Sequence, residues 1–187
     1  HSPLALIVRR DTGIRSALDL PGHRLMIGPD AAELSAYFKL SRINESDFRL
    51  VPHSQNLDDL VNGRVDGMTI YTTNQPFSLL QQGVNFVLIR AIDGGVDFYG
   101  DTLFTTESEI QNHRNRAEAF RAASIRGWSF AMEHTSETAE MIHAKYAPGK
   151  SLEHLRWEGE HYQRLIVPDL VELGHMSPQR WRRISDV

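Results

Sequence analysis

The sequence predicts an α/β protein in which a sheet with crossover helices occupies the first half of the chain and helices occupy the second. Strand and helix signals alternate between Pro3 and Ile89, an order typical of an α/β sheet with right-handed crossovers. From Thr106 onward, strand signals disappear and helix caps multiply. The 187 residues are 41% hydrophobic, which is enough for one ordinary core or two small lobes.

The first half contains short runs rich in aliphatic residues, and each run predicts a strand. Strands are expected at residues 3–10, 23–27, 48–52, 66–70 and 84–89, with helices at 31–40, 57–62 and 75–82 between them. Asp30 followed by Glu33 matches the capping-box pattern, which predicts that the first helix begins there. Gly63 and Gly83 are expected to end the other two helices.

The second half contains helix caps and helical periodicity. Helices are expected at residues 116–133, 136–146 and 151–166, with Thr106 and Glu109 as an earlier cap and Pro178 opening the last turn. Apolar and small residues recur at helical spacing, which predicts faces that belong to the core. These residues are Ala117, Phe120, Ser124, Gly127, Trp128 and Ala131, followed by Leu152, Leu155, Tyr162, Leu165 and Ile166.

Two junctions between a predicted strand and a helix carry groups suited to a ligand, because open α/β sheets bind ligands beyond the carboxyl ends of their strands. At Gly28 to Ala31 the backbone N–H groups could receive an anion or a carbonyl oxygen, unless Asp30 only caps the helix. At Tyr71 to Pro76 a ring, two hydroxyls and two amides suit a neutral polar heterocycle. The alternative for the second junction is a solvated loop.

A third cluster, Asp97 to Phe104, joins the two halves of the chain. Gly100 lies there among acids and aromatic residues, including Tyr99, and this predicts a bend that acts as a hinge. Asp101 could bind a ligand N–H or only fix the bend.

Composition excludes several classes of function. The net charge of −4, the pI near 6.1 and the scattered arginines exclude a general electrostatic grip on nucleic acid or anionic lipid. The absence of cysteine excludes a disulfide, a thiolate metal site and a cysteine nucleophile, and it fits a periplasmic setting. The G-x-S-x-G, Walker A, H-E-x-x-H and G-x-G-x-x-G motifs are also absent, so neither a catalytic site nor a cofactor is predicted.

One pattern favours a metal-dependent enzyme instead. Glu140 with His143 and Glu158 with His161 form two E-x-x-H pairs on successive predicted helices. Di-iron carboxylate bundles use two such pairs, but they place them in a core of four long helices. Because the first half of this chain is predicted to form strands, a solvated helix face is the favoured interpretation and no metal site is predicted.

A series of segments runs through essentially the whole chain: SPLALIVRRDTGI, DLPGHRLMI, VNGRVDG, YTTNQPFSLLQQG, DFYGDTLFTT, AFRAASIRGWSFAMEH and LIVPDLVELGHMSPQRWRRISD. Together they resemble the family of periplasmic binding proteins for the pyrimidine precursor of thiamine. Close relatives form the extracytoplasmic sensor part of membrane-bound diguanylate cyclases and histidine kinases. The resemblance implies a type II periplasmic-binding fold of two lobes that closes on a small molecule without catalysis.

The resemblance also implies a division of the chain. Residues 1–21 would be a hinge strand and a remnant of lobe I, residues 22–96 the α/β lobe II, and residues 97–187 the return hinge and C-terminal helices of lobe I. The family begins with a further stretch that builds the first half of lobe I, which is missing here. The helices after Thr106 are therefore expected to expose an apolar face, so that the chain forms a homodimer or repacks these helices onto lobe II.

The ligand residues implied by the resemblance come from all three junctions. Tyr71 and Tyr99 would stack on a ring, Asn74 and Gln75 would read its edges, and residues 28–31 would offer N–H donors. The family usually has Asn-Glu-Pro where this chain has Asn-Gln-Pro, so a carboxylate that could pair with an aminopyrimidine becomes a neutral amide.

Several functions therefore stay open. The favoured function is the extracytoplasmic sensor domain of a membrane signalling protein, linked to the membrane only by a tether outside this chain. The alternatives are a free solute-binding protein of an ABC transporter, the metal-dependent enzyme, and a dimerisation module whose cleft has lost its ligand.

Overall fold

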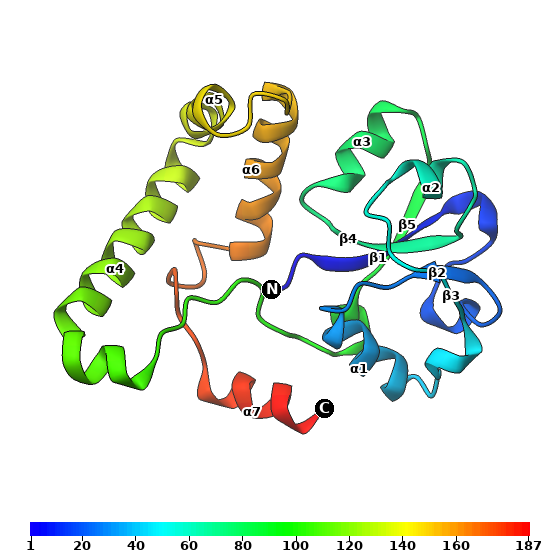
Figure 1. The fold of residues 1–187 in the computed structure, drawn as a ribbon, viewed down its shortest axis with the longest axis horizontal. Helices are drawn as coiled ribbons and strands as arrows, with labels where there is room; N and C mark the ends of the chain where they lie inside the picture. Colours follow the sequence, from blue (N-terminus) through cyan, green and yellow to red (C-terminus); the bar gives the residue numbers. More distant parts are fainter. The chain divides into compact units, whose positions relative to one another are not determined.

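The computed structural model describes residues 1–187 and divides the chain into two compact units. Unit 1 comprises His1–Phe98 together with Pro178–Val187, and unit 2 comprises Tyr99–Ser177. Figure 1 shows the helices and strands of both units along the chain.

The sheet of unit 1 has five strands in the order β3-β2-β4-β1-β5. Their bounds are β1 Leu4–Arg9, β2 Arg24–Met26, β3 Arg49–Leu50, β4 Gly67–Tyr71 and β5 Phe86–Ile89. β2 is parallel to β3 and β4, whereas β1 is antiparallel to both β4 and β5. The sheet is therefore mixed, with β1 running against the other four strands, and the five predicted strands are confirmed.

β1 lies inside this sheet, between β4 and β5, and not in a separate lobe. Its residues Ala5 to Val8 are all fully buried. A strand covered on both faces has a continuous apolar sequence, which is why residues 3–10 carry no polar alternation. Residues 1–21 thus belong with residues 22–96, which differs from the predicted boundary at residue 22.

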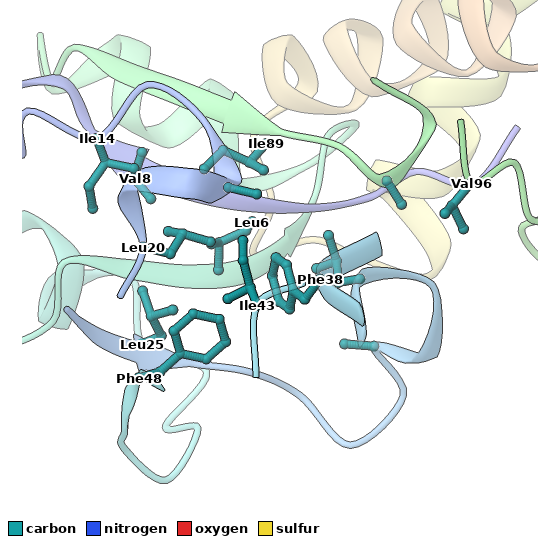
Figure 2. Packing of buried hydrophobic residues seen from close by; sticks show 14 residues of the cluster. Leu6, Val8, Ile14, Leu20, Leu25, Phe38, Ile43, Phe48, Ile89 and Val96 are labelled. Atoms are coloured by element: carbon teal, nitrogen blue, oxygen red, sulfur yellow. The ribbon is translucent and has the colours of Figure 1, made fainter. Parts of the chain in front are cut away.

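Alternate residues of β1 enter the two hydrophobic cores of unit 1, as the pleat of a strand requires. Leu6 and Val8 join Phe38, whose ring meets Phe48 edge-on with the centroids 5.3 Å apart. Figure 2 shows this first core around Leu6, Phe38 and Phe48. The second core contains Ala5, Ile7, Met26, Leu60, Val65, Met68, Ile70 and Leu79.

Three helices of unit 1 follow its strands: α1 Ala32–Leu40, α2 Asp58–Val61 and α3 Gln75–Gln81. Short 3₁₀ turns occupy Arg10–Thr12, Ala17–Asp19, Glu45–Asp47 and Ala91–Gly94. Gly63 and Gly83 follow α2 and α3 with φ of +69° and +68°, so both predicted helix ends are confirmed. Pro178 opens α7, Pro178–Asp186, as predicted.

The predicted capping box at the start of α1 is wrong. The N-cap residue is Ala31, and no side chain caps this helix. Glu33 is instead only 5% exposed, and its Oε1 accepts a 2.7 Å hydrogen bond from Ser2 Oγ. The hydrogen bond from Ser2, which is distant in the sequence, therefore engages the Glu33 carboxylate that the sequence pattern predicted as part of the cap.

Unit 2 is helical, with α4 Glu107–Glu133, α5 Thr135–Lys145 and α6 Leu152–Ile166. The predicted cap at Thr106 is confirmed, because its Oγ1 accepts from the Glu109 N–H at 3.1 Å. Ser151 caps α6 in the same way through the His154 N–H at 3.2 Å. At His113 the backbone leaves the helical region, which bends α4 near its start. None of the helices in the chain has the length and apolar character of a membrane span.

The prediction that the apolar stripe of α4 belongs to the core is wrong within this chain. None of its residues is buried, and Phe120 and Trp128 are 62% and 44% exposed. In α6 only Leu155 is buried. The periodicity correctly predicted an amphipathic helix, but the burial of its apolar face needs a surface to cover it.

Candidate functional site

Polar loops gather at one edge of the sheet of unit 1. Because β2, β3, β4 and β5 run in the same direction, their carboxyl ends meet at this edge, together with the amino end of β1. We call this edge the carboxyl edge and define it by residues 1–3, 27–31, 51–56, 71–75 and 90–91. Open α/β sheets bind their ligands at such an edge.

The loop after β2 uses part of its backbone internally. The Gly28 N–H donates to Thr69 Oγ1 at 2.9 Å, and the Ala31 N–H donates to the Gly28 carbonyl at 3.2 Å. These two N–H groups, predicted to receive a ligand, therefore already have acceptors. A Cβ on Gly28 would lie 2.9 Å from Asp30 Oδ1 and 3.3 Å from Thr69 Oγ1, so any residue other than glycine would require these side chains to shift.

The loop after β4 is closed by its own amides. Gln75 Oε1 accepts from the Tyr71 N–H at 3.0 Å, and the Asn74 N–H donates to the Tyr71 carbonyl at 3.0 Å. The Tyr71 side chain is 42% exposed at the end of β4. Thr73 is 1% exposed and its Oγ1 has no hydrogen-bond partner. Gln75 therefore holds the turn that presents the Tyr71 ring.

The loop after β3 belongs to the carboxyl edge but is missing from the sequence prediction. The Gln55 N–H donates to His53 Nδ1 at 3.0 Å, so the ring proton is on Nε2, which lies 3.2 Å from the Thr69 carbonyl. His53 is thus a neutral donor that ties β3 to β4. Gln55 has a φ of +58°, a left-handed conformation that is uncommon outside glycine. The polar run His-Ser-Gln-Asn directly after a predicted strand was the signal that could have located this loop.

Charged groups of both signs lie at or near the carboxyl edge. Asp30 is exposed and has no ion-pair partner. Glu33 is buried close by, and burial raises its pKa above the ordinary value. Two guanidinium groups lie nearby, but both are paired: Arg90 with Asp93 at 2.7 Å, and Arg180 with Asp97 at 2.5 Å.

The other two predicted ligand residues, Tyr99 and Asp101, belong to unit 2. Tyr99 Oη accepts from the Ser177 N–H at 2.7 Å, which joins the first residue of unit 2 to its last. Asp101 is exposed next to the bend at Gly100. Their part in ligand binding stays a prediction.

The first E-x-x-H pair has other partners. Glu140 forms an ion pair with Arg156 at 2.8 Å, and His143 Nδ1 lies 2.8 Å from the Lys150 carbonyl. Both contacts join α5 to residues at or before α6.

The second pair is occupied in a similar way. Glu158 accepts from Lys150 Nζ at 2.5 Å, and the His161 ring stacks on Trp157 with the centroids 3.6 Å apart. The structure brings no three His, Cys, Asp or Glu side chains together where they could hold a metal ion. These four residues act as packing and ion-pair partners within unit 2.

A comparison with protein families matches residues 1–138 to the family described as NMT1/THI5 like. The chain belongs to the NMT1/THI5-like family. None of the curated proteins matches it.

Solved structures share the fold of this NMT1/THI5-like chain. The periplasmic aliphatic sulphonate binding protein SsuA from Escherichia coli is 13% identical with a TM-score of 0.72, and the match covers 85% of this chain and 52% of that one. The alkanesulfonate-binding protein SsuA from Xanthomonas axonopodis pv. citri, bound to MOPS, is 12% identical with a TM-score of 0.66 over 85% and 55% of the two chains. A ligand-binding component of an ABC-type import system from Staphylococcus aureus, with zinc bound, is 14% identical with a TM-score of 0.56 over 100% and 72%.

The chain thus spans about half the length of the two SsuA proteins. Identities this low establish the fold alone, and that fold is the α/β fold of periplasmic binding proteins. These similar proteins are binding proteins and not enzymes by description, and the two SsuA proteins are binding proteins for sulfonates.

Proposed function

We propose that this chain is a small-molecule binding domain whose ligand is a pyrimidine-like heterocycle, of the kind from which thiamine is built. The observation that carries the proposal is the convergence of three polar loops, those after β2, β3 and β4, at the carboxyl edge of unit 1. The family match and the shared fold with periplasmic binding proteins support binding in general.

Each residue of the loops after β2 and β4 has a different role in the proposed binding of the ligand. Tyr71 offers an exposed ring for stacking at the end of β4, and Asn74 offers an amide to a ring edge. Gln75 fixes the position of the Tyr71 backbone through its Oε1 and keeps its NH₂ group as a donor. Gly28 lets Asp30 and Thr69 lie close to the backbone of the loop after β2, because any side chain there would meet both of them.

The charge at the carboxyl edge favours a heterocycle over a sulfonate. A sulfonate carries a full negative charge, and binding it needs cationic or N–H donors that are not already used. The nearby guanidinium groups are paired, and Asp30 adds a negative charge without a partner. We therefore propose a ligand different from those of the two SsuA proteins.

Binding is tested by thermal melting and isothermal titration with 4-amino-5-hydroxymethyl-2-methylpyrimidine, thiamine and methanesulfonate. A ligand at 100 times its Kd adds about 2.7 kcal/mol of stability, so a pyrimidine that binds should raise the Tm clearly. Tyr71→Ala should remove most of this shift, whereas Tyr146→Ala, which changes an exposed tyrosine of unit 2, should keep it. A shift with methanesulfonate and none with the pyrimidine would contradict the proposed ligand.

We propose an extracytoplasmic sensor domain as the biological setting, with a solute-binding protein of an ABC importer as the alternative. The likeness to the periplasmic SsuA protein from Escherichia coli supports a periplasmic location, and the likeness to the import-system component from Staphylococcus aureus supports the importer. The resemblance of the sequence supports the sensor. Fractionation of cells that express the full-length protein tests the location. An intact membrane-bound protein with an output domain supports the sensor, and a free periplasmic protein supports the importer.

We also propose that a second copy of the chain covers the exposed apolar face of α4. This face forms a groove of about 730 Å³ lined by Leu103, Phe104, Ile110, Ala117 and Phe120. The ion pairs Arg114 with Glu118 and Arg116 with Glu109 border the groove, so a copy related by a two-fold axis would meet a rim with balanced charge. Light scattering should give twice the chain mass for the native protein, and a charged residue at position 120 should return it to one chain mass.

A further inference from the structure

The carboxylate of Asp30 and the hydroxyl of Thr69 both lie close to the backbone of Gly28 at the carboxyl edge. An ideal Cβ on Gly28 would lie 2.9 Å from the carboxylate oxygen and 3.3 Å from the hydroxyl oxygen. Both oxygens therefore lie on the side of Gly28 where other residues carry a side chain. We propose, on the basis of the function proposed above, that Asp30 is the specificity-determining carboxylate of the site and selects ligands that carry an N–H donor.

The Asp30 carboxylate is available for this role because it does not cap α1. The helix has no side-chain cap, and Asp30 forms neither an ion pair nor a side-chain hydrogen bond in the structure. A carboxylate with no internal partner at a ligand-binding edge retains its full capacity to accept hydrogen bonds. It can accept the N–H of an amino-substituted ring as a charge-assisted hydrogen bond.

Gln75 does not replace this carboxylate, because its side chain is a neutral amide. Its Oε1 already accepts the Tyr71 N–H at 3.0 Å, and an amide oxygen carries no formal charge. A charged acceptor for a ligand amino group must therefore come from another loop. Asp30 is the charged acceptor that the loop after β2 supplies.

Thr69 supplies a complementary group beside Asp30. Its Oγ1 accepts the Gly28 N–H at 2.9 Å, so the hydroxyl proton is still free to be donated. An aminopyrimidine presents an amino donor next to a ring-nitrogen acceptor, which matches an acceptor beside a donor. Because Thr69 is only 7% exposed, its contribution depends on position 28 having no side chain that would push its hydroxyl away.

Isothermal titration of three variants against 4-amino-5-hydroxymethyl-2-methylpyrimidine tests the assignment. Asp30→Asn should weaken binding at least tenfold, and Gly28→Ala should do the same while retaining the carboxylate, because its Cβ would displace both oxygens. Asp169→Asn, which removes an exposed acid of unit 2, should bind as the parent chain does. The 4-oxo analogue, which lacks the amino group, should bind the parent chain and Asp30→Asn with similar affinity.

The outcomes of these titrations distinguish a failure of the role of Asp30 from a failure of the proposed function. Unchanged aminopyrimidine binding by Asp30→Asn, with binding by the parent chain intact, would overturn the role of Asp30 and leave the proposed function standing. Binding of methanesulfonate by the parent chain in place of the pyrimidine would overturn both. The absence of binding for every probe would likewise reject the proposed function, and the role of Asp30 with it. Circular dichroism melts of the free variants should coincide within about 2 °C, because both changed positions lie at the surface loop after β2.

Discussion

The two units of this chain use apolar residues in opposite ways. Unit 1 buries them in two cores on the two faces of its sheet, whereas α4 in unit 2 extends over 27 residues without burying one. Both units have amphipathic helices, so helix amphipathicity by itself does not determine burial. A sheet provides a broad apolar surface for helices to cover, and within this chain α4 has no comparable partner surface.

The largest expected difference between the units is in the cost of removing a phenylalanine. Phe38→Ala should destabilise the protein by about 3–5 kcal/mol, because the side chain is 1% exposed and packed edge-on against Phe48. In the single chain, Phe120→Ala should change stability by less than about 0.5 kcal/mol, because that side chain is 62% exposed, and the proposed second copy should raise this cost as the protein concentration rises. Urea denaturation followed by circular dichroism measures both. A large cost for Phe120→Ala would show that a partner covers α4 in solution.

A smaller effect is expected from the ion pair that joins β2 to β4. Burial acts to raise the pKa of Asp66, but hydrogen bonds from the Arg24 side chain and backbone outweigh it and hold that pKa below 3.8. Because the pKa of Asp66 is lowered in the folded state, the stabilisation from its ion pair with Arg24 is present above pH 3.8. It is lost as the pH falls through the lowered pKa of the folded state. Asp66→Asn should cost about 2 kcal/mol at pH 7 and flatten the acid limb of the stability curve.

The matched control for this prediction is Asp93→Asn, which removes a more exposed ion pair with Arg90. Its cost should stay below about 1 kcal/mol. Equal losses for the two variants would mean that burial of Asp66 adds nothing to the ion pair.

A third effect tests how unit 2 is stabilised without a core of comparable size. Ser151→Ala should cost about 1 kcal/mol, because the side chain caps α6 through the His154 N–H. Hydrogen exchange measured by mass spectrometry should show faster exchange in α6, while Ser136→Ala, with no such contact, leaves it unchanged. Faster exchange throughout unit 1 as well would indicate that the two units unfold together.

The smallest effect has the opposite sign and concerns unit 1. Burial raises the pKa of Glu33 above 4.5, so its ionised form is disfavoured in the folded state. The free energy of unfolding should therefore fall as the pH rises from 4.5 through the raised pKa of Glu33 in the folded state. Glu33→Gln keeps an acceptor for Ser2 and should raise stability at pH 7 by less than about 1 kcal/mol. A pH titration of urea denaturation checks this, and a loss of stability in the variant would contradict it.

The strands and helix ends of unit 1 could be predicted because their signals are local. The apolar run at residues 3–10 and the glycines at 63 and 83 need no distant partner to act. The candidate site was predicted in part: Tyr71 and the loop after β2 lie at the carboxyl edge, but the loop at residues 53–55 was missed. Its contribution depends on a contact between His53 and Thr69, which are on different strands or their loops.

The sequence alone determined the order of the elements, their amphipathic faces, the cap of α4 and the absence of cysteine chemistry. Tertiary structure decided which carboxylates form hydrogen bonds or ion pairs and which apolar helix faces are buried. Glu33 does not cap α1 because Ser2 lies beside it in the fold, and Asp30 does not cap the helix either. Helical and strand signals depend on neighbours in sequence, whereas burial and hydrogen-bond partners depend on surfaces that only folding brings together.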